Sequence, residues 1–188
     1  MKHINCSMRL LEWGKSLRIA VLALPFVAVS LSTAVLAQQL PAHVHGVARL
    51  ELIAQGTELS VSLLSPLDNW VGFEHAPRNA AQKAAIEKAK SDIATKELIA
   101  FNPEALCKLK RAEFEPGLPK THSHKGDVHA ESEASWEFHC EQPDLLKELR
   151  LPLFKAYPRF AKIQAAAADA DGQSAGTLTA KSPTLRLP

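Results

Sequence analysis

Two cysteines, Cys107 and Cys140, place the strongest constraint on how this chain folds. No Cys-x-x-Cys redox or zinc pattern joins them, so a structural disulfide is the expected pairing in an oxidising compartment. Residues 131–140 alternate between apolar and polar side chains, and Cys140 falls on the apolar face with Trp136 and Phe138. A bridge would close a loop of about 34 residues, worth roughly 4 kcal/mol in the chain-entropy model. We therefore predict a hairpin stapled by a disulfide.

The first 37 residues predict a secretory signal peptide. A basic start is followed by an apolar run over residues 19–36, which ends in Val35-Leu36-Ala37, with short residues where a signal peptidase cuts. We expect cleavage after Ala37 and export. The alternative is an uncleaved membrane anchor. The run is near the lower length limit for a span, and Pro25 and the cleavage-like end argue against an anchor. The later sequence has no second long apolar run, so we expect no stable membrane insertion after cleavage.

Charge excludes one class of function. The chain has 22 Lys and Arg and 20 Asp and Glu. The predicted signal peptide takes four of the basic residues and only Glu12 of the acidic ones, leaving 18 against 19 and a net charge of −1. A nucleic-acid partner requires a basic patch, and none is visible in the mature sequence. We expect no nucleic-acid binding.

Alternation and turn residues predict most of the elements before the first cysteine. Residues 47–54 and 58–65 alternate on either side of Gln55-Gly56-Thr57, which is typical of a β-hairpin with one buried face. An irregular stretch follows at 65–70. Residues 80–98 predict a helix that Asn79 and Gln82 cap, with a thin apolar stripe and an Asp92–Lys96 pair. Asn102-Pro103 is expected to end it, and the narrow stripe places it outside a sheet.

The second half predicts mainly strands. A weaker strand is expected at 105–114, a loop at 116–130, a strong strand at 131–140 and a helical turn at 143–146. Pro152 makes residues 149–153 an edge-type strand. Alanines at 160–168 favour a helix, but Asp171-Gly172 and the residues after it favour a hairpin, so we predict strands there and a short last strand at Leu185–Leu187. The expected fold class is α+β, a mainly antiparallel sheet or open barrel with one substantial helix.

Histidine is the enriched group that carries chemistry. Imidazole suits zinc, copper and nickel, and two neighbouring histidines on flexible backbone can reach one ion. Two His-x-His pairs are present, and three further histidines follow later or stand alone, so the candidate ligands are His43, His45, His75, His122, His124, His129 and His139. The alternatives stay open: a polar loop with incidental histidines, a turn hydrogen bond for His75 and simple solvation for His139.

No motif points to an enzyme. The chain has no Gly-x-Ser-x-Gly, no phosphate-binding glycine loop and no His-Glu-x-x-His. We expect a protein that is not an enzyme. An unrecognised exported enzyme stays open as a further hypothesis.

Several runs resemble the ZrgA family of zinc-regulated periplasmic proteins. The matching runs are His43 to Ala48, the expected strand at Leu59–Leu63, Ser65-Pro66, Val71 to Pro77, Cys107, Trp136-x-Phe138-x-Cys140, Leu153 to Pro158 and Pro183-x-Leu185-Arg186-Leu187. The run Val71-Gly72-Phe73-Glu74-His75-Ala76-Pro77 is the most specific. One departure stands out: family members often carry a long run rich in His, Asp and Glu between the cysteines, and residues 120–129 are a short version of it.

The resemblance implies a periplasmic protein that binds zinc, carries the disulfide and assists a zinc ABC importer. The domain plan is then a signal peptide at 1–37 and a single ZrgA-like domain at 38–188 with a mobile histidine loop at 116–130. A second hypothesis is a non-metal interaction module, in which the sheet or the segment around Phe73 docks a partner. We expect Phe73 itself to anchor that segment in the core.

Overall fold

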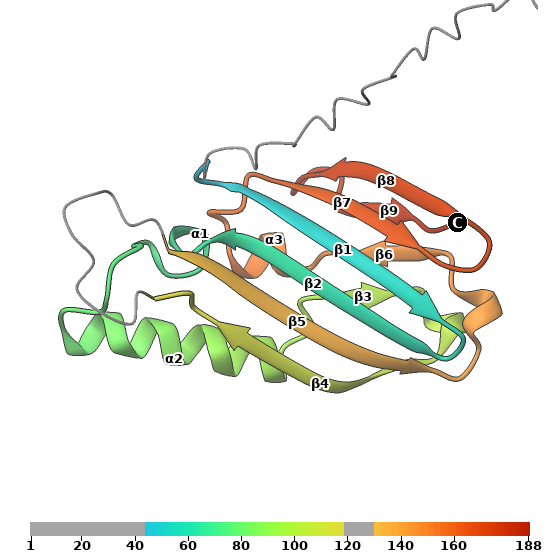
Figure 1. Ribbon diagram of the computed structural model, residues 1–188, viewed down its shortest axis with the longest axis horizontal. Helices are drawn as coiled ribbons and strands as arrows, with labels where there is room; N and C mark the ends of the chain where they lie inside the picture. Colours follow the sequence, from blue (N-terminus) through green and yellow to red (C-terminus); the bar gives the residue numbers. More distant parts are fainter. Residues whose placement is uncertain (1–43, 119–129) are drawn as a thin grey trace, which may run out of the picture. The chain divides into compact units, whose positions relative to one another are not determined.

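The computed structural model describes residues 44–118 and 130–188, which form two open β-sheets and one long helix (Figure 1). The six-stranded sheet has the order β4-β5-β2-β1-β7-β8 and the three-stranded sheet the order β3-β6-β9. Neighbouring strands are antiparallel except for β1 and β7. The predicted α+β class is confirmed. The predicted signal peptide, residues 1–37, and most of the predicted loop lie outside the described residues.

The element bounds follow the sequence patterns closely. The strands are β1 (Val47–Gln55), β2 (Glu58–Pro66), β3 (Ala100–Phe101), β4 (Cys107–Glu115), β5 (Glu131–Cys140), β6 (Glu148–Arg150), β7 (Lys162–Ala168), β8 (Gln173–Leu178) and β9 (Thr184–Arg186). The α-helices are α1 (Asp68–Val71), α2 (Ala80–Thr95) and α3 (Leu153–Ala156), and the 3₁₀ turns are η1 (Pro103–Ala105) and η2 (Pro143–Leu145). Within the described part of the chain, no helix is both long and apolar enough to span a membrane.

The predicted β1–β2 hairpin forms the middle of the large sheet. Gln55 pairs with Glu58 across a turn in which Gly56 has φ +58°, a conformation that glycine adopts without strain. Strand β5 then pairs with β2 and sets Trp136 opposite Val61, with both side chains buried. The apolar faces predicted from alternation therefore form one continuous core face.

Helix α2 packs against this face and begins where its cap predicts. The Asn79 side chain accepts the Gln82 N–H at 2.9 Å, and the Gln82 side chain accepts the Arg78 N–H at 2.7 Å. The Trp136 indole N–H donates to the Ile93 carbonyl at 3.1 Å and ties the helix to β5. The predicted end was wrong: the helix stops at Thr95. Leu98 and Ile99 are buried in a bend before β3 instead, so tertiary burial outweighs helix propensity there.

Asp92 makes more contacts than the predicted ion pair with Lys96. Lys96 lies 2.9 Å away, as expected, but the carboxylate is buried and also binds Lys88 and the Tyr157 hydroxyl. Burial alone would raise the pKa of Asp92, but these hydrogen bonds outweigh it and hold the pKa below its usual value. Burial and the bond to Asp92 raise the pKa of Tyr157. Asp92 thus joins α2 to the segment after α3.

Two other local predictions were wrong. Residues 65–70 are not irregular, because β2 continues through Pro66 and α1 follows at once. Strand β6 is not an edge strand: it ends at Arg150, before Pro152, and lies between β3 and β9. The strands chosen over a helix after residue 160 are confirmed as β7 and β8.

The disulfide is confirmed and links two directly opposed positions. Cys107 pairs with Cys140 in the register of β4 and β5, and the two residues are bonded. Cys140 is fully buried, as the alternation of β5 predicts. The bond therefore pins the start of the edge strand β4 to the core strand β5.

Cys140→Ser should lower the free energy of unfolding by about 2–5 kcal/mol, because the reduced chain loses a cross-link between residues 33 apart. Urea denaturation of the oxidised wild type and the variant measures this. Reductant provides the matched control: it should destabilise the wild type by a similar amount and leave the variant unchanged. Two free thiols in the native exported protein would contradict the prediction.

Candidate metal site

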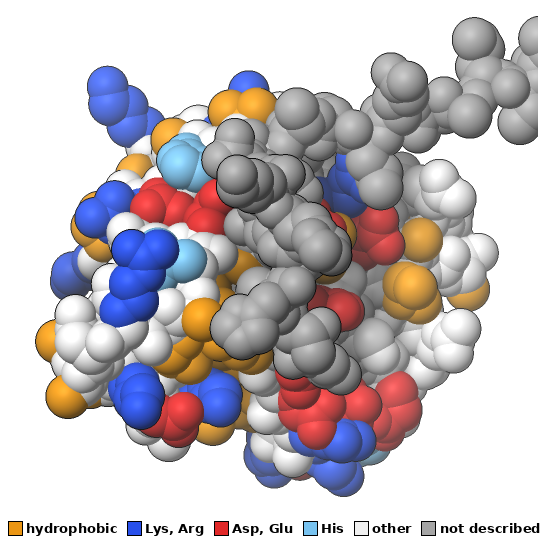
Figure 2. Space-filling model, turned by 60° about the vertical axis from the view of Figure 1, so that its left-hand side comes forward, with side chains coloured by type: hydrophobic (Ala, Val, Ile, Leu, Met, Phe, Trp, Pro, Cys, Tyr) orange, Lys and Arg blue, Asp and Glu red, His pale blue; other side chains and the backbone are white. Residues whose placement is uncertain are grey.

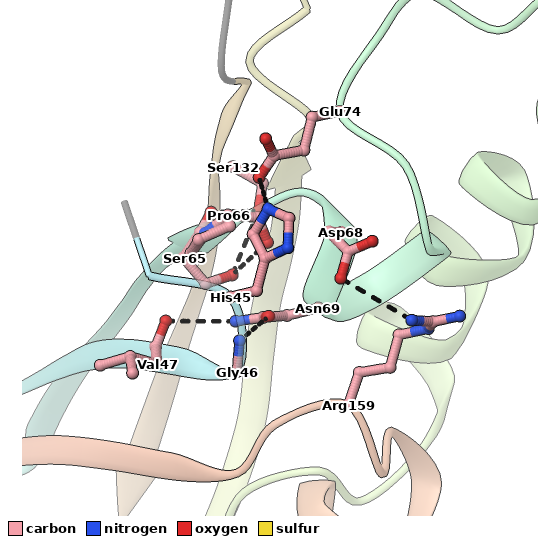
Figure 3. Close-up of polar contacts among 10 residues, drawn as sticks. All are labelled: His45, Gly46, Val47, Ser65, Pro66, Asp68, Asn69, Glu74, Ser132 and Arg159. Atoms are coloured by element: carbon pink, nitrogen blue, oxygen red, sulfur yellow. Dashed lines mark hydrogen bonds and ion pairs between the residues drawn. The ribbon is translucent and has the colours of Figure 1, made fainter. Parts of the chain in front are cut away.

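One end of the large sheet brings a histidine and a carboxylate together. His45 comes just before β1, and Glu74 lies just after α1. The His45 Nε2 atom is 3.2 Å from Glu74 Oε1, with the histidine side chain 59% exposed and the glutamate side chain 13% exposed (Figure 3). A largely buried carboxylate therefore meets an imidazole that solvent can reach.

Helix α1 positions Glu74 through its buried tryptophan and its glycine end. The Trp70 ring packs edge to face on Phe114, Tyr157 and Phe160, with centroids 4.7–5.4 Å apart. Gly72 ends the helix at φ +85°, and its N–H donates to the Asp68 carbonyl at 2.9 Å. The chain then leaves the core, which brings Glu74 toward His45.

His75 lies on the same segment with one ring nitrogen already used. Its Nδ1 is 2.9 Å from the Ala76 carbonyl, and its ring stacks on Phe73 with centroids 5.2 Å apart. Because a carbonyl oxygen only accepts, Nδ1 carries the proton in this contact, and a neutral ring keeps a lone pair on Nε2. Histidines that bind metals are oriented by this kind of hydrogen bond. The predicted turn hydrogen bond of His75 is therefore present and is compatible with a ligand role.

The surface at this end mixes histidine with acidic side chains. Figure 2 brings this end of the sheet forward, and histidine side chains lie beside red carboxylates on it. Arg159 adds a cation here, at 3.7 Å from Asp68. The charge around the His45–Glu74 pair is thus both acidic and basic.

His139 forms a similar pair at the opposite end of the sheet. Its Nδ1 is 2.7 Å from Glu58 Oε1, and the glutamate side chain is 62% exposed. The hydrogen bond from His139 holds the pKa of Glu58 below its usual value. Strand β1 has nine residues, so at about 3.3 Å per residue the two pairs are roughly 26 Å apart or more. His45 and His139 cannot bind the same ion.

The structure thus divides the predicted ligands into groups. His43, His122, His124 and His129 lie outside the described residues, and their predicted role stays a prediction. In the described part of the chain, no three His, Cys, Asp or Glu side chains are arranged to hold a metal ion. The pairs His45–Glu74 and His139–Glu58 are what the fold assembles.

The sequence did not identify the carboxylate partners, and it misplaced Phe73. Glu74 and Glu58 are far from their histidines in sequence, so only the fold brings them together. The predicted core anchor Phe73 was wrong: it is half-buried and outside the core, because Gly72 turns the chain outward. Trp70 is the anchor instead, with 5% exposure.

Comparison with known protein families gives a match over most of the chain. The model of a family described as "ZrgA family zinc uptake protein" matches residues 42–187. No curated protein sequence matches the chain.

Trp70→Ala should lower the free energy of unfolding by about 3–5 kcal/mol, because it empties the space among three aromatic rings. Phe73→Ala, the matched aromatic control, should cost about 1 kcal/mol or less, since its ring is half-exposed. Chemical denaturation monitored by circular dichroism measures both. Equal losses in the two variants would mean that Phe73 anchors the segment as strongly as Trp70 does.

Proposed function

The chain belongs to the ZrgA family of zinc uptake proteins, and we propose that it is a periplasmic accessory protein that captures zinc and supports a zinc ABC importer. A signal peptide at 1–37 would deliver the mature domain, residues 38–188, to the periplasm. Zinc is the cargo in this proposal, and reversible binding is the required chemistry.

The spacing of His45 and Glu74 is the observation that supports zinc binding. Zinc takes imidazole nitrogen and carboxylate oxygen at about 2.0–2.2 Å in a tetrahedron. Two such ligand atoms lie about 3.3 Å apart across one edge of that tetrahedron. The 3.2 Å between His45 Nε2 and Glu74 Oε1 matches this edge. A zinc ion could bind both atoms with little change in their separation.

Two protein ligands are too few for a lasting site, so others must complete it. The proposed additional ligands are His43, two residues before His45, and His122, His124 and His129. The residues that flank 119–129 support this assignment: the Leu67 N–H donates to the Ala130 carbonyl at 2.9 Å, at the same end of the sheet as His45. His75 is a further candidate, because its Nδ1 is already bound to Ala76.

The expected affinity suits transfer of zinc to another protein. Structural zinc sites contribute about 10–16 kcal/mol, whereas ordering backbone costs about 1–2 kcal/mol per residue. Ordering the eight residues from His122 to His129 would offset much of the binding energy. A site that relies on that stretch should bind at roughly micromolar affinity or weaker, in keeping with capture and release.

A non-metal interaction module is the second candidate function. The half-exposed Phe73 ring, stacked on His75, favours it, because a partly exposed aromatic residue is a common contact in protein interfaces. In that case the segment 72–77 would bind a protein partner, and the histidines would be incidental.

His45→Ala and Glu74→Gln should each weaken zinc binding by at least about tenfold, because each removes one ligand of the pair. His139→Ala is the matched control, since it breaks an equivalent pair at the far end of the sheet. Calorimetric titration of the mature protein with zinc measures all three. The site is elsewhere if His139→Ala weakens binding and His45→Ala does not.

The same titration separates the loop from the sheet end. His122→Ala/His124→Ala/His129→Ala in one protein should weaken zinc binding further than either single variant. Unchanged affinity in this triple variant would exclude the loop and leave the sheet end as the whole site. No measurable zinc binding in the wild type would favour the interaction module.

Zinc affinity should fall as the pH drops from about 7.5 to 5.5, because the metal needs neutral imidazole, whose reference pKa is near 6.5. Binding should also release protons, which calorimetry in buffers of different ionisation enthalpy detects. Affinity that is constant over this pH range would argue against histidine ligands.

A further inference from the structure

A buried asparagine on α1 holds the backbone that carries His45. Asn69 is 1% exposed, and its side chain makes two hydrogen bonds to the start of β1. Its Oδ1 accepts the Gly46 N–H at 2.7 Å, and its Nδ2 donates to the Val47 carbonyl at 3.2 Å (Figure 3). Because an N–H only donates and a carbonyl only accepts, these two partners determine the orientation of the amide.

Gly46 is held on both of its polar groups. Its carbonyl accepts the N–H groups of Ala161 and Lys162 at 2.8 and 3.0 Å, where β7 begins. Its φ of +79° favours glycine, and an added Cβ would lie 3.1 Å from the Ala161 side chain. The residue after His45 therefore has little freedom, and Asn69 supplies the bond that ties it to α1.

The same short helix also positions the other half of the pair. Only two residues separate Asn69 from Gly72, and the turn at Gly72 leads to Glu74. Between them, Trp70 packs in the aromatic cluster. One rigid segment therefore contacts the strand of His45 through Asn69 and carries Glu74 at its end. The separation of the two zinc-binding atoms depends on this link.

We propose that Asn69 is a positioning residue for zinc binding: it touches no metal but fixes the His45 backbone so that Nε2 and Glu74 Oε1 stay one zinc-tetrahedron edge apart. The inference rests on the proposed function of the pair. Its physical basis is that a donor pair which is already spaced correctly loses less conformational freedom on binding. Groups that orient metal ligands typically change affinity by about 10–100-fold when they are removed.

The test combines Asn69→Ala with a matched asparagine elsewhere. Asn102 is a second clamp of the same kind: its Oδ1 accepts the Lys147 N–H at 2.8 Å and its Nδ2 donates to the Leu145 carbonyl at 2.8 Å. Asn69→Ala should weaken zinc binding by about tenfold or more, and Asn102→Ala should leave it within about twofold of the wild type. Amide hydrogen exchange of metal-free protein should show Gly46 exchanging faster only in Asn69→Ala.

A double-variant cycle distinguishes positioning from general loosening. If Asn69 acts through His45, Asn69→Ala should have no further effect on zinc affinity in a His45→Ala background. A full tenfold loss in that background would overturn the proposal, as would unchanged Gly46 exchange in Asn69→Ala. Should Asn69→Ala fail to fold, Asn69→Asp keeps the acceptor for Gly46 and loses only the donor to Val47, so zinc affinity is the readout for that variant, with a smaller expected loss, and unchanged affinity would overturn the proposal.

The failure of the proposed function gives a different pattern. If His45→Ala itself leaves zinc affinity unchanged, the pair is not the zinc site, and the positioning role falls with it whatever Gly46 exchange shows. If His45→Ala weakens binding but Asn69→Ala does not, the site stands and the role of Asn69 alone is overturned.

Discussion

The antiparallel pairing of β2 with β5 is the constraint on which the rest of the structure depends. Its register sets Leu59, Val61 and Leu63 opposite Phe138, Trp136 and Ala134, so these buried apolar side chains share one core face. A slip of one residue would turn these side chains to solvent. The disulfide fixes the neighbouring register of β4 with β5, because Cys140 ends β5 opposite Cys107.

The same register gives the two ends of the sheet different chemistry. At the hairpin end, His139 meets Glu58, and the glutamate is 62% exposed; at the other end, His45 meets Glu74, which is 13% exposed. Water screens the first pair, so its attraction for a cation is weak. A carboxylate that has lost most of its hydration gains more from a metal ion, which is why the proposal places zinc at the Glu74 end.

Local patterns predicted the parts of the fold that one element determines alone. Alternation located β1, β2 and β5, and Asn79 marked the start of α2, because these signals come from adjacent side chains. Local patterns failed where contacts with residues distant in the sequence determine an element. Burial of Leu98 ends α2 early, and pairing with β3 and β9 makes β6 the central strand of its sheet despite the nearby Pro152. The parallel pairing of β1 with β7 was also invisible, since alternation shows which face is buried but not which strand lies alongside.

The candidate site shows the same division. Its histidines could be found by composition, because imidazole chemistry belongs to the residue itself. Glu74 and Asn69 could not be found as members of one site, because each acts through a residue more than 20 positions away in the chain. Asn69 in particular looks like an ordinary polar residue in a short helix until β1 is placed against it.

Competition between a proton and zinc follows from the chemistry of imidazole. A protonated Nε2 has no lone pair for a metal, so the protonated and the zinc-bound states of His45 would exclude each other. In the proposed site, a spacing near that of a zinc-tetrahedron edge would let zinc bind without rebuilding the backbone, and the small number of ligands among the described residues would keep the ion exchangeable. A protein that must take up zinc and then give it away needs both properties. In this fold the spacing comes from α1, and the exchangeability comes from how few ligands the sheet end supplies.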